Sequence, residues 1–169
     1  MRRFFLGFVL GLILPILALL VAARQGWLSV SASARPPAWE TWIADMALDA
    51  GAARQAPRRQ NPIPATEAEL LAGLKLYRND CAGCHGDFGK PADWGARFYP
   101  RVPQFSEDPP RKPDWQIFWI IQNGVRHSGM GGWAGQVPAA DIWRMAAFLA
   151  RLEKLPPAVA AEWRNPPRP

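Results

Sequence analysis

The chain has 169 residues, of which 49% are hydrophobic, and a formal net charge of +6. The positive charge is concentrated at the N-terminal side: residues 1–65 carry 7 Lys and Arg against 3 Asp and Glu, whereas residues 66–155 carry 11 against 10. This distribution argues against nucleic acid as a partner and favours contact between the N-terminal part and anionic lipid. The nearly neutral segment of about 90 residues can bury only a small core.

An apolar run over residues 4–23 follows Arg2 and Arg3. At a rise of about 1.5 Å per residue, a helix of this length spans about 30 Å, the hydrocarbon core of a bilayer. The arginines place the N-terminus in the cytoplasm and the following chain outside. We therefore expect residues 1–27 to be a single-pass anchor in a bacterial inner membrane, with the rest on the periplasmic side. A cleaved signal peptide is the alternative, because small-residue cleavage sites follow the run.

Residues 28–64 connect this segment to the next. The spacing of Trp39, Ile43, Met46 and Ala50 predicts one face of an amphipathic helix, and the prolines near residue 64 predict a stiff linker. We expect this juxtamembrane helix to lie on the bilayer or on its own domain. Docking to a partner subunit is the alternative.

The only two cysteines stand in the pattern Cys81-Ala82-Gly83-Cys84-His85. This C-x-x-C-H pattern is typical of c-type haem attachment, in which two thiols react with the porphyrin vinyl groups and the histidine ligates the iron. A thioredoxin-like redox pair would need a βαβ context, and zinc would need four ligands in suitable geometry. A structural disulfide is a further alternative. The pattern predicts one haem c, attached covalently through Cys81 and Cys84, with His85 as an iron ligand.

Two amphipathic helices are predicted on either side of this motif. Thr66 and Glu69 form a capping box that predicts a helix start, and its apolar face is Leu70, Leu74 and Tyr77. A mid-helix glycine, Gly73, indicates that another backbone comes close. A second amphipathic helix is predicted over residues 141–152, and a short one over 114–123 with Gly124 at its end.

The positions of these residues resemble class I cytochromes c. In that family a glycine and an aromatic residue precede the first cysteine at four-residue intervals, as Gly73 and Tyr77 precede Cys81. The last helix then crosses at the glycine with residues such as Met145 and Phe148. The resemblance covers residues 65–156 and implies an all-α class I haem domain behind the transmembrane helix. We expect residues 157–169 to be a disordered, proline-rich tail.

The resemblance also implies a second axial ligand. Class I cytochromes take it from a Gly-Met loop ahead of the last helix, a position that Met130 occupies. His127 is the competing ligand, and an open iron site is the third alternative. The proline that usually follows the methionine is replaced by Gly131, which implies a looser loop.

Other haem contacts follow from the same resemblance. A proline carbonyl is expected to accept a hydrogen bond from the ligand histidine, and either Pro103 or Pro100 can supply it. Trp133 is expected to pack on the porphyrin edge. For Trp94, Trp115 and Trp119, ordinary core packing is preferred to haem contact.

These features predict an electron carrier without catalytic activity of its own. Its expected partners are a redox donor and acceptor, membrane lipid, and in addition other subunits of a respiratory complex. One alternative is a haem enzyme or sensor for peroxide or a diatomic gas, with a labile sixth ligand. Another is a fixed cytochrome c subunit of a larger oxidoreductase.

Overall fold

The computed structural model describes residues 1–166, which fold into α-helices and one short 3-10 helix, η1 (Gly95–Arg97). No β-strand occurs within these residues, where strand-like pairing is limited to an isolated bridge between Asp87 and Lys90. The prediction of an all-α fold is therefore confirmed. The chain divides into two units, residues 1–34 and residues 35 onward, which are considered separately.

The first unit contains α1 (Arg2–Arg24), which is long and apolar enough to cross a membrane. Its side chains are exposed along its length, as expected of a helix whose apolar surface has no protein partner. Pro15 lies within the helix, where it removes a backbone donor without ending the segment. α1 is thus a candidate membrane anchor.

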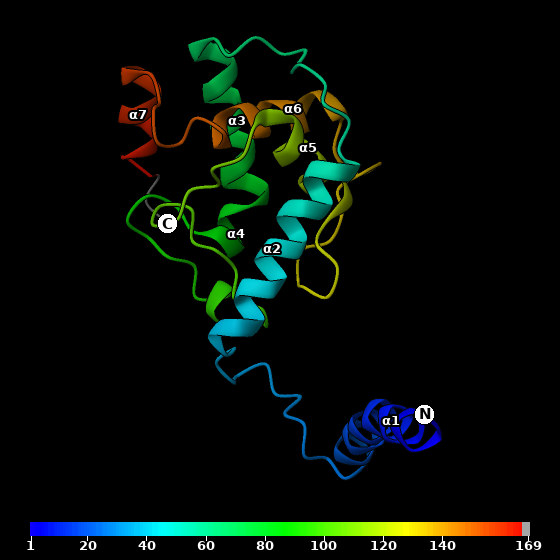
Figure 1. Cartoon of the computed structure of the whole chain (residues 1–169). Helices are drawn as coiled ribbons and strands as arrows, with labels where there is room; N and C mark the ends of the chain where they lie inside the picture. The colour runs from blue at the N-terminus through cyan, green and yellow to red at the C-terminus, as the bar shows by residue number, and fades with distance from the viewer. Residues whose placement is uncertain (167–169) are drawn as a thin grey trace. The chain divides into compact units, whose positions relative to one another are not determined.

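The core of the second unit forms where α3 (Glu67–Asp80) and α6 (Ala139–Leu149) cross (Figure 1). The Thr66 hydroxyl accepts a 3.3 Å hydrogen bond from the Glu69 N–H, which confirms the predicted start of α3. Gly73 lies directly against α6, because a Cβ atom at this position would collide with the Arg144 carbonyl. The prediction that this glycine admits another backbone is therefore confirmed.

Helix α5 (Asp114–Asn123) completes this core and has the predicted bounds. The Phe118 ring stacks on Trp143 of α6, with ring centroids 4.0 Å apart. Helix α6 ends three residues earlier than predicted, at Leu149. The Arg151 and Leu152 N–H groups bond to carbonyls three residues back, a pattern that tightens the last turn and ends the helix.

The predicted disorder of the tail is wrong over residues 157–163, which form α7 (Pro157–Trp163). Val159 and Trp163 are buried in the core, and the Trp163 ring packs edge-on against Tyr77, with centroids 5.8 Å apart. The guanidinium of Arg78 adds hydrogen bonds to the Glu162 side chain and to α7 carbonyls. Two buried side chains and one shared arginine offset the ordering cost that the proline-rich composition suggested. The prediction for residues 167–169 lies outside the described residues.

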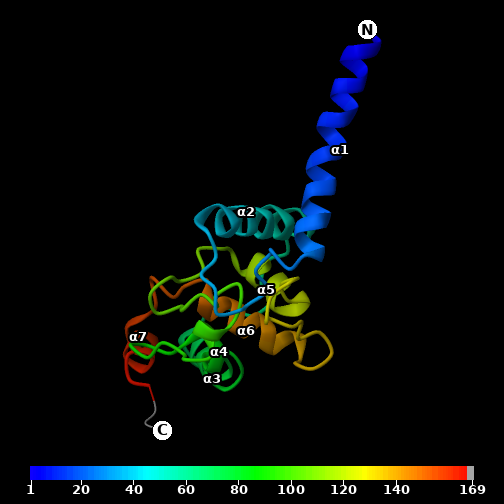
Figure 2. The ribbon, with the colours of Figure 1, turned by 90° about the horizontal axis from the view of Figure 1, so that it is seen from below.

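Helix α2 (Ala38–Gln55) lies across α5 (Figure 2) and confirms the helix predicted from the Trp39–Ala50 spacing. Beyond it, the Asn61 side-chain amide donates hydrogen bonds to the Asp114 carboxylate (2.8 Å) and to the Trp143 carbonyl (3.1 Å). These bonds fasten the predicted linker to α5 and α6.

Candidate haem attachment site

Cys84 and His85 lie on the single helical turn α4 (Ala82–His85), and Cys81 is the N-cap of that turn. The turn follows α3 directly, and the Cys81 carbonyl accepts hydrogen bonds from the Cys84 and His85 N–H groups at 3.0 and 2.9 Å. The buried Tyr77 hydroxyl donates to the carbonyl of Gly86, just past the turn, and its pKa is raised above its usual range chiefly by burial. The C-x-x-C-H residues are thus presented at the end of α3, a helix whose Leu70, Gly73, Leu74 and Tyr77 are buried.

Both thiols are unpaired, so the structure gives no support to a disulfide. Cys81 is half-buried beside α6, with its Sγ 3.9 Å from Met145 Sδ, and burial raises its pKa to about 12. Cys84 is exposed. Cys81, at the edge of the core, and Cys84, at the surface, are therefore both available to form a covalent bond to the same flat group.

The His85 ring is fixed from two sides. Its Nδ1–H donates to the Pro103 carbonyl at 3.0 Å, and the Phe105 ring stacks on the imidazole with centroids 4.2 Å apart. Between the two prolines considered from the sequence, the structure pairs His85 with Pro103. Burial lowers the pKa of His85, which keeps the imidazole neutral. Because Nδ1 carries the donated proton, Nε2 keeps a lone pair for a metal.

Gln104 is a site residue that sequence reasoning missed. Its side-chain N–H groups donate to the carbonyls of Cys84 and Val102, both at 3.0 Å, and its Oε1 accepts from the Ala92 N–H at 2.7 Å. One side chain thereby joins the cysteine turn to the loop that carries Pro103. No periodicity singles out this glutamine, and its position directly after Pro103 is the only signal that the sequence offers.

Met130 lies on a separate loop between α5 and α6, half-buried at the edge of the core. Its N–H donates to the Ser128 hydroxyl (3.1 Å), which itself donates to the Val125 carbonyl (2.7 Å), and the Val125 N–H returns a bond to the Met130 carbonyl (2.9 Å). Gly124, at φ +73°, lies so close to this loop that a Cβ would meet the Met130 carbonyl at 2.7 Å. His127, the competing ligand, is exposed and adopts a left-handed φ of +58°.

Aromatic residues lie beside the Met130 loop and the segment that follows the cysteine turn. The Phe98 ring, from the segment after the cysteine turn, occupies the space that a side chain on Gly129 would need. Trp133 is half-buried against the core, and its backbone N–H donates to the Ile121 carbonyl at 3.1 Å. Trp115 and Trp119 are also half-buried, whereas Trp94 is 64% exposed beside Arg97, so core packing was the wrong expectation for Trp94.

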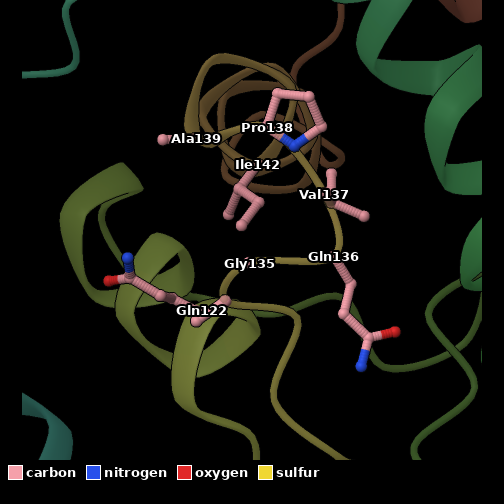
Figure 3. Close-up of a pocket in the computed structure, with 8 residues that line it drawn as sticks. Gln122, Gly135, Gln136, Val137, Pro138, Ala139 and Ile142 are labelled. Atoms are coloured by element: carbon pink, nitrogen blue, oxygen red, sulfur yellow. The ribbon is translucent and has the colours of Figure 1, made fainter.

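A pocket lies between the end of α5 and the start of α6 (Figure 3). Gln122, Gly135, Gln136 and Ile142 are among its lining residues, and none of the lining side chains is ionisable. The pocket therefore supplies no acid or base. Residues 1–166 also contain no cluster of three His, Cys, Asp or Glu side chains that could hold a metal ion, so the zinc alternative has no support there.

The donor set fits a c-type haem. Free thiols stand three residues apart on one turn, followed by a neutral histidine whose second nitrogen is already bonded to the backbone. Together with the α3–α6 crossing, these features are similar to those of a class I c-type cytochrome domain. Residues 68–149 match the family model described as cytochrome c oxidase, cbb3-type, subunit III, and the match covers a little under half of the chain. Searches of curated proteins and of solved structures found no match.

Proposed function

We propose that this protein carries electrons at the periplasmic face of a bacterial inner membrane through one haem c. The haem is bonded to Cys81 and Cys84, and the iron is ligated by His85 and Met130. The observation that carries the proposal is the hydrogen bond from His85 Nδ1 to the Pro103 carbonyl within a C-x-x-C-H turn. This bond leaves the other ring nitrogen unprotonated and fixes its direction, which an axial ligand needs.

The chain's residues would act by holding the redox centre with little rearrangement. The bound haem supplies a one-electron couple at its iron. Pro103 and Phe105 keep the His85 ring in one orientation, so the imidazole would need little rearrangement to hold the iron in either oxidation state. A Met130 thioether favours the ferrous state and raises the reduction potential. Trp133 and Phe98 contribute apolar surface beside the Met130 loop, which limits water access.

Met130 is preferred to His127 as the sixth ligand because of its position. Met130 is half-buried against the core, and its loop is closed by three hydrogen bonds that include Ser128 and Val125. His127 is exposed, and its positive φ turns the backbone at a point where most residues are strained.

The proposal is tested by optical spectra of the oxidised protein as wild type, Met130→Ala and the matched control His127→Ala. We expect a low-spin spectrum with a weak long-wavelength sulfur-to-iron band that Met130→Ala abolishes and His127→Ala retains. A low-spin spectrum that changes only in His127→Ala would move the ligand to His127. A high-spin wild-type spectrum would favour the enzyme or sensor alternative.

The family match favours a second candidate, a fixed subunit of a larger oxidoreductase, because the matched family is a subunit of an oxidase. The two candidates differ in how tightly the protein is held by others. Co-purification of further subunits in constant ratio after mild solubilisation would support the subunit, whereas a single species would support the independent carrier.

A further inference from the structure

Helix α2 has apolar residues on two opposite faces. On one face, Ala52 and the following Ala56 are buried and Leu48 is half-buried where the helix packs on α5. This face accounts for the attachment of α2 to the haem domain. It leaves the other apolar face unexplained.

Polar contacts fix α2 to the domain near both ends. Near its C-terminal end, the Asp49 carboxylate pairs with Lys112 at 2.6 Å, and the Asp49 carbonyl accepts from the Gln116 side chain at 3.3 Å. Near its N-terminal end, the Tyr99 hydroxyl donates to the Glu40 carboxylate, and this bond raises the pKa of Tyr99. The rotation of α2 about its own axis is therefore set by the haem domain.

The outward stripe of α2 consists of Trp39, Trp42, Ile43 and Met46. These residues stand at positions i, i+3, i+4 and i+7, so they share one helix face, and Leu48 and Ala52 fall on the opposite side. Both tryptophans are 65% exposed and Met46 is 50% exposed. Contiguous apolar surface of this kind marks an interaction site.

The chain itself indicates what covers this stripe. α2 begins directly after the short segment 25–37 that follows the candidate membrane helix α1. The same segment carries exposed Trp27 and Leu28. Tryptophan is enriched at the membrane–water interface because its ring is apolar and its N–H is polar.

The charge of α2 indicates how the contact is made. The helix carries Glu40, Asp45 and Asp49 against Arg54, so it gains nothing from anionic headgroups. Attraction must come from burying the uncharged stripe. This restricts the anionic-lipid contact expected from the overall charge of residues 1–65 to the basic residues outside α2.

We propose that the outward stripe of α2 inserts into the headgroup–acyl boundary of the bilayer and holds the haem domain in one orientation to the membrane. The inference rests on the membrane anchoring by α1 that is part of the proposed function. Because Asp49 and Glu40 tie α2 to α5 and to the loop containing Tyr99, seating the stripe on the bilayer orients these elements as well. One side of the domain is then withdrawn from soluble partners.

The first test uses the full-length holoprotein in nanodiscs of brominated phosphatidylcholine, a zwitterionic lipid that quenches nearby tryptophan. Trp39→Phe/Trp42→Phe removes the two tryptophans of the stripe and leaves Trp27, so we expect the lipid-quenched share of the fluorescence to fall by roughly two-thirds. Trp94→Phe is the matched control, since Trp94 is 64% exposed elsewhere in the same unit, and its removal should leave the lipid-quenched signal unchanged. The quenching should persist at high salt.

A second measurement reads the orientation directly. In stacked, oriented membranes the wild-type haem should show a preferred angle in linear dichroism. Trp39→Ser/Trp42→Ser should broaden the distribution of haem angles relative to the membrane, whereas Trp94→Ser should leave it unchanged. The haem spectrum in solution should be the same in all three proteins.

Several results would overturn the inference. If the protein stays in the nanodiscs but Trp39 and Trp42 are not quenched, the contact between α2 and the bilayer is excluded while the anchor is not. If native mass spectrometry shows dimers that dissociate in the Trp39→Ser/Trp42→Ser variant, the stripe instead binds a second copy of the chain. Quenching that disappears at high salt would exclude an apolar contact. Release of the protein from the discs would overturn the anchor in the proposed function, and this inference with it.

Discussion

The two segments proposed to supply the iron ligands, the turn with His85 and the loop with Met130, are held in place by different contacts. His85 lies on a helical turn continuous with α3, and it is fixed by a side-chain bond to Pro103 and by the stacked Phe105 ring. Met130 lies on a glycine-rich loop that makes three hydrogen bonds within itself, and its attachment to the core consists of the close approach to Gly124 and of backbone bonds from Trp133 and Ala134 to carbonyls of α5. The difference predicts that the histidine side sets the geometry and that the methionine side adapts to it.

The largest expected effect comes from removing each ligand in turn. His85→Ala should prevent accumulation of stable holoprotein, because it removes the proposed iron ligand together with the Pro103 bond and the Phe105 stacking partner. Met130→Ala should retain attached haem and lose only the sulfur-to-iron band, with a lower reduction potential. Haem-stained gels and potentiometry of both variants measure this, and equal yields of holoprotein would contradict the asymmetry.

A smaller effect is expected from a methyl group on the histidine side. In Gly95→Ala the new Cβ would lie 2.5 Å from both the Cys84 carbonyl oxygen and Gln104 Nε2, so the brace around the cysteine turn must shift. Overpacking of this kind costs about 1–3 kcal/mol of unfolding free energy. Denaturant unfolding of the holoprotein measures the loss. Unchanged stability would show that the Gln104 brace yields easily.

On the methionine side, Ser128→Ala removes a hydroxyl that bridges the Val125 carbonyl and the Met130 N–H. We expect Ser128→Ala to lower the free energy of unfolding by about 1 kcal/mol. We also expect a larger fraction of protein without the sulfur-to-iron band at high temperature, measured by optical spectra on heating. Ser128→Thr, which keeps the hydroxyl, is the matched control. A loss of band in both variants alike would place the effect in packing rather than in the hydrogen bonds.

The smallest effect, of opposite sign, is expected at Gly131. An added Cβ there meets no atom within 4 Å, and the residue does not adopt a left-handed φ, so Gly131→Ala introduces no clash. It should stabilise the protein by about 0.4–1 kcal/mol, because the unfolded chain loses freedom. Comparing the unfolding midpoints of Gly131→Ala and Gly95→Ala measures the difference in constraint between the Met130 loop and the cysteine turn. A destabilised Gly131→Ala would mean that the Met130 loop is as constrained as the cysteine turn.

The sequence predicts those parts of the fold whose information is local. The C-x-x-C-H pattern, the capping box at Thr66 and the spacing of Gly73 with Tyr77 each lie within a few turns of chain, and the structure has the helices and the close approach that they imply.

The remaining features depend on contacts between distant segments. The choice of Pro103 over Pro100, and the role of Gln104, follow from the course of an irregular loop that no periodic pattern describes. α7 was missed because the tail of residues 157–169 is proline-rich as a whole, while only two of the helix's side chains reach the core. The sequence-based assignment of Met130 as a ligand stays a prediction.

The crossing of α3 and α6 has a consequence for the order of folding. The Glu69–Arg144 ion pair, at 2.6 Å, joins residues that are 75 positions apart, so the chain must close a long loop before this interface contributes stability. The α4 turn needs only bonds between near neighbours and forms without that closure. The Cys81 and Cys84 thiols should therefore be presented on their turn before the α3–α6 interface has formed, so a haem that reacted with them at this stage would be in place before the helix crossing closes.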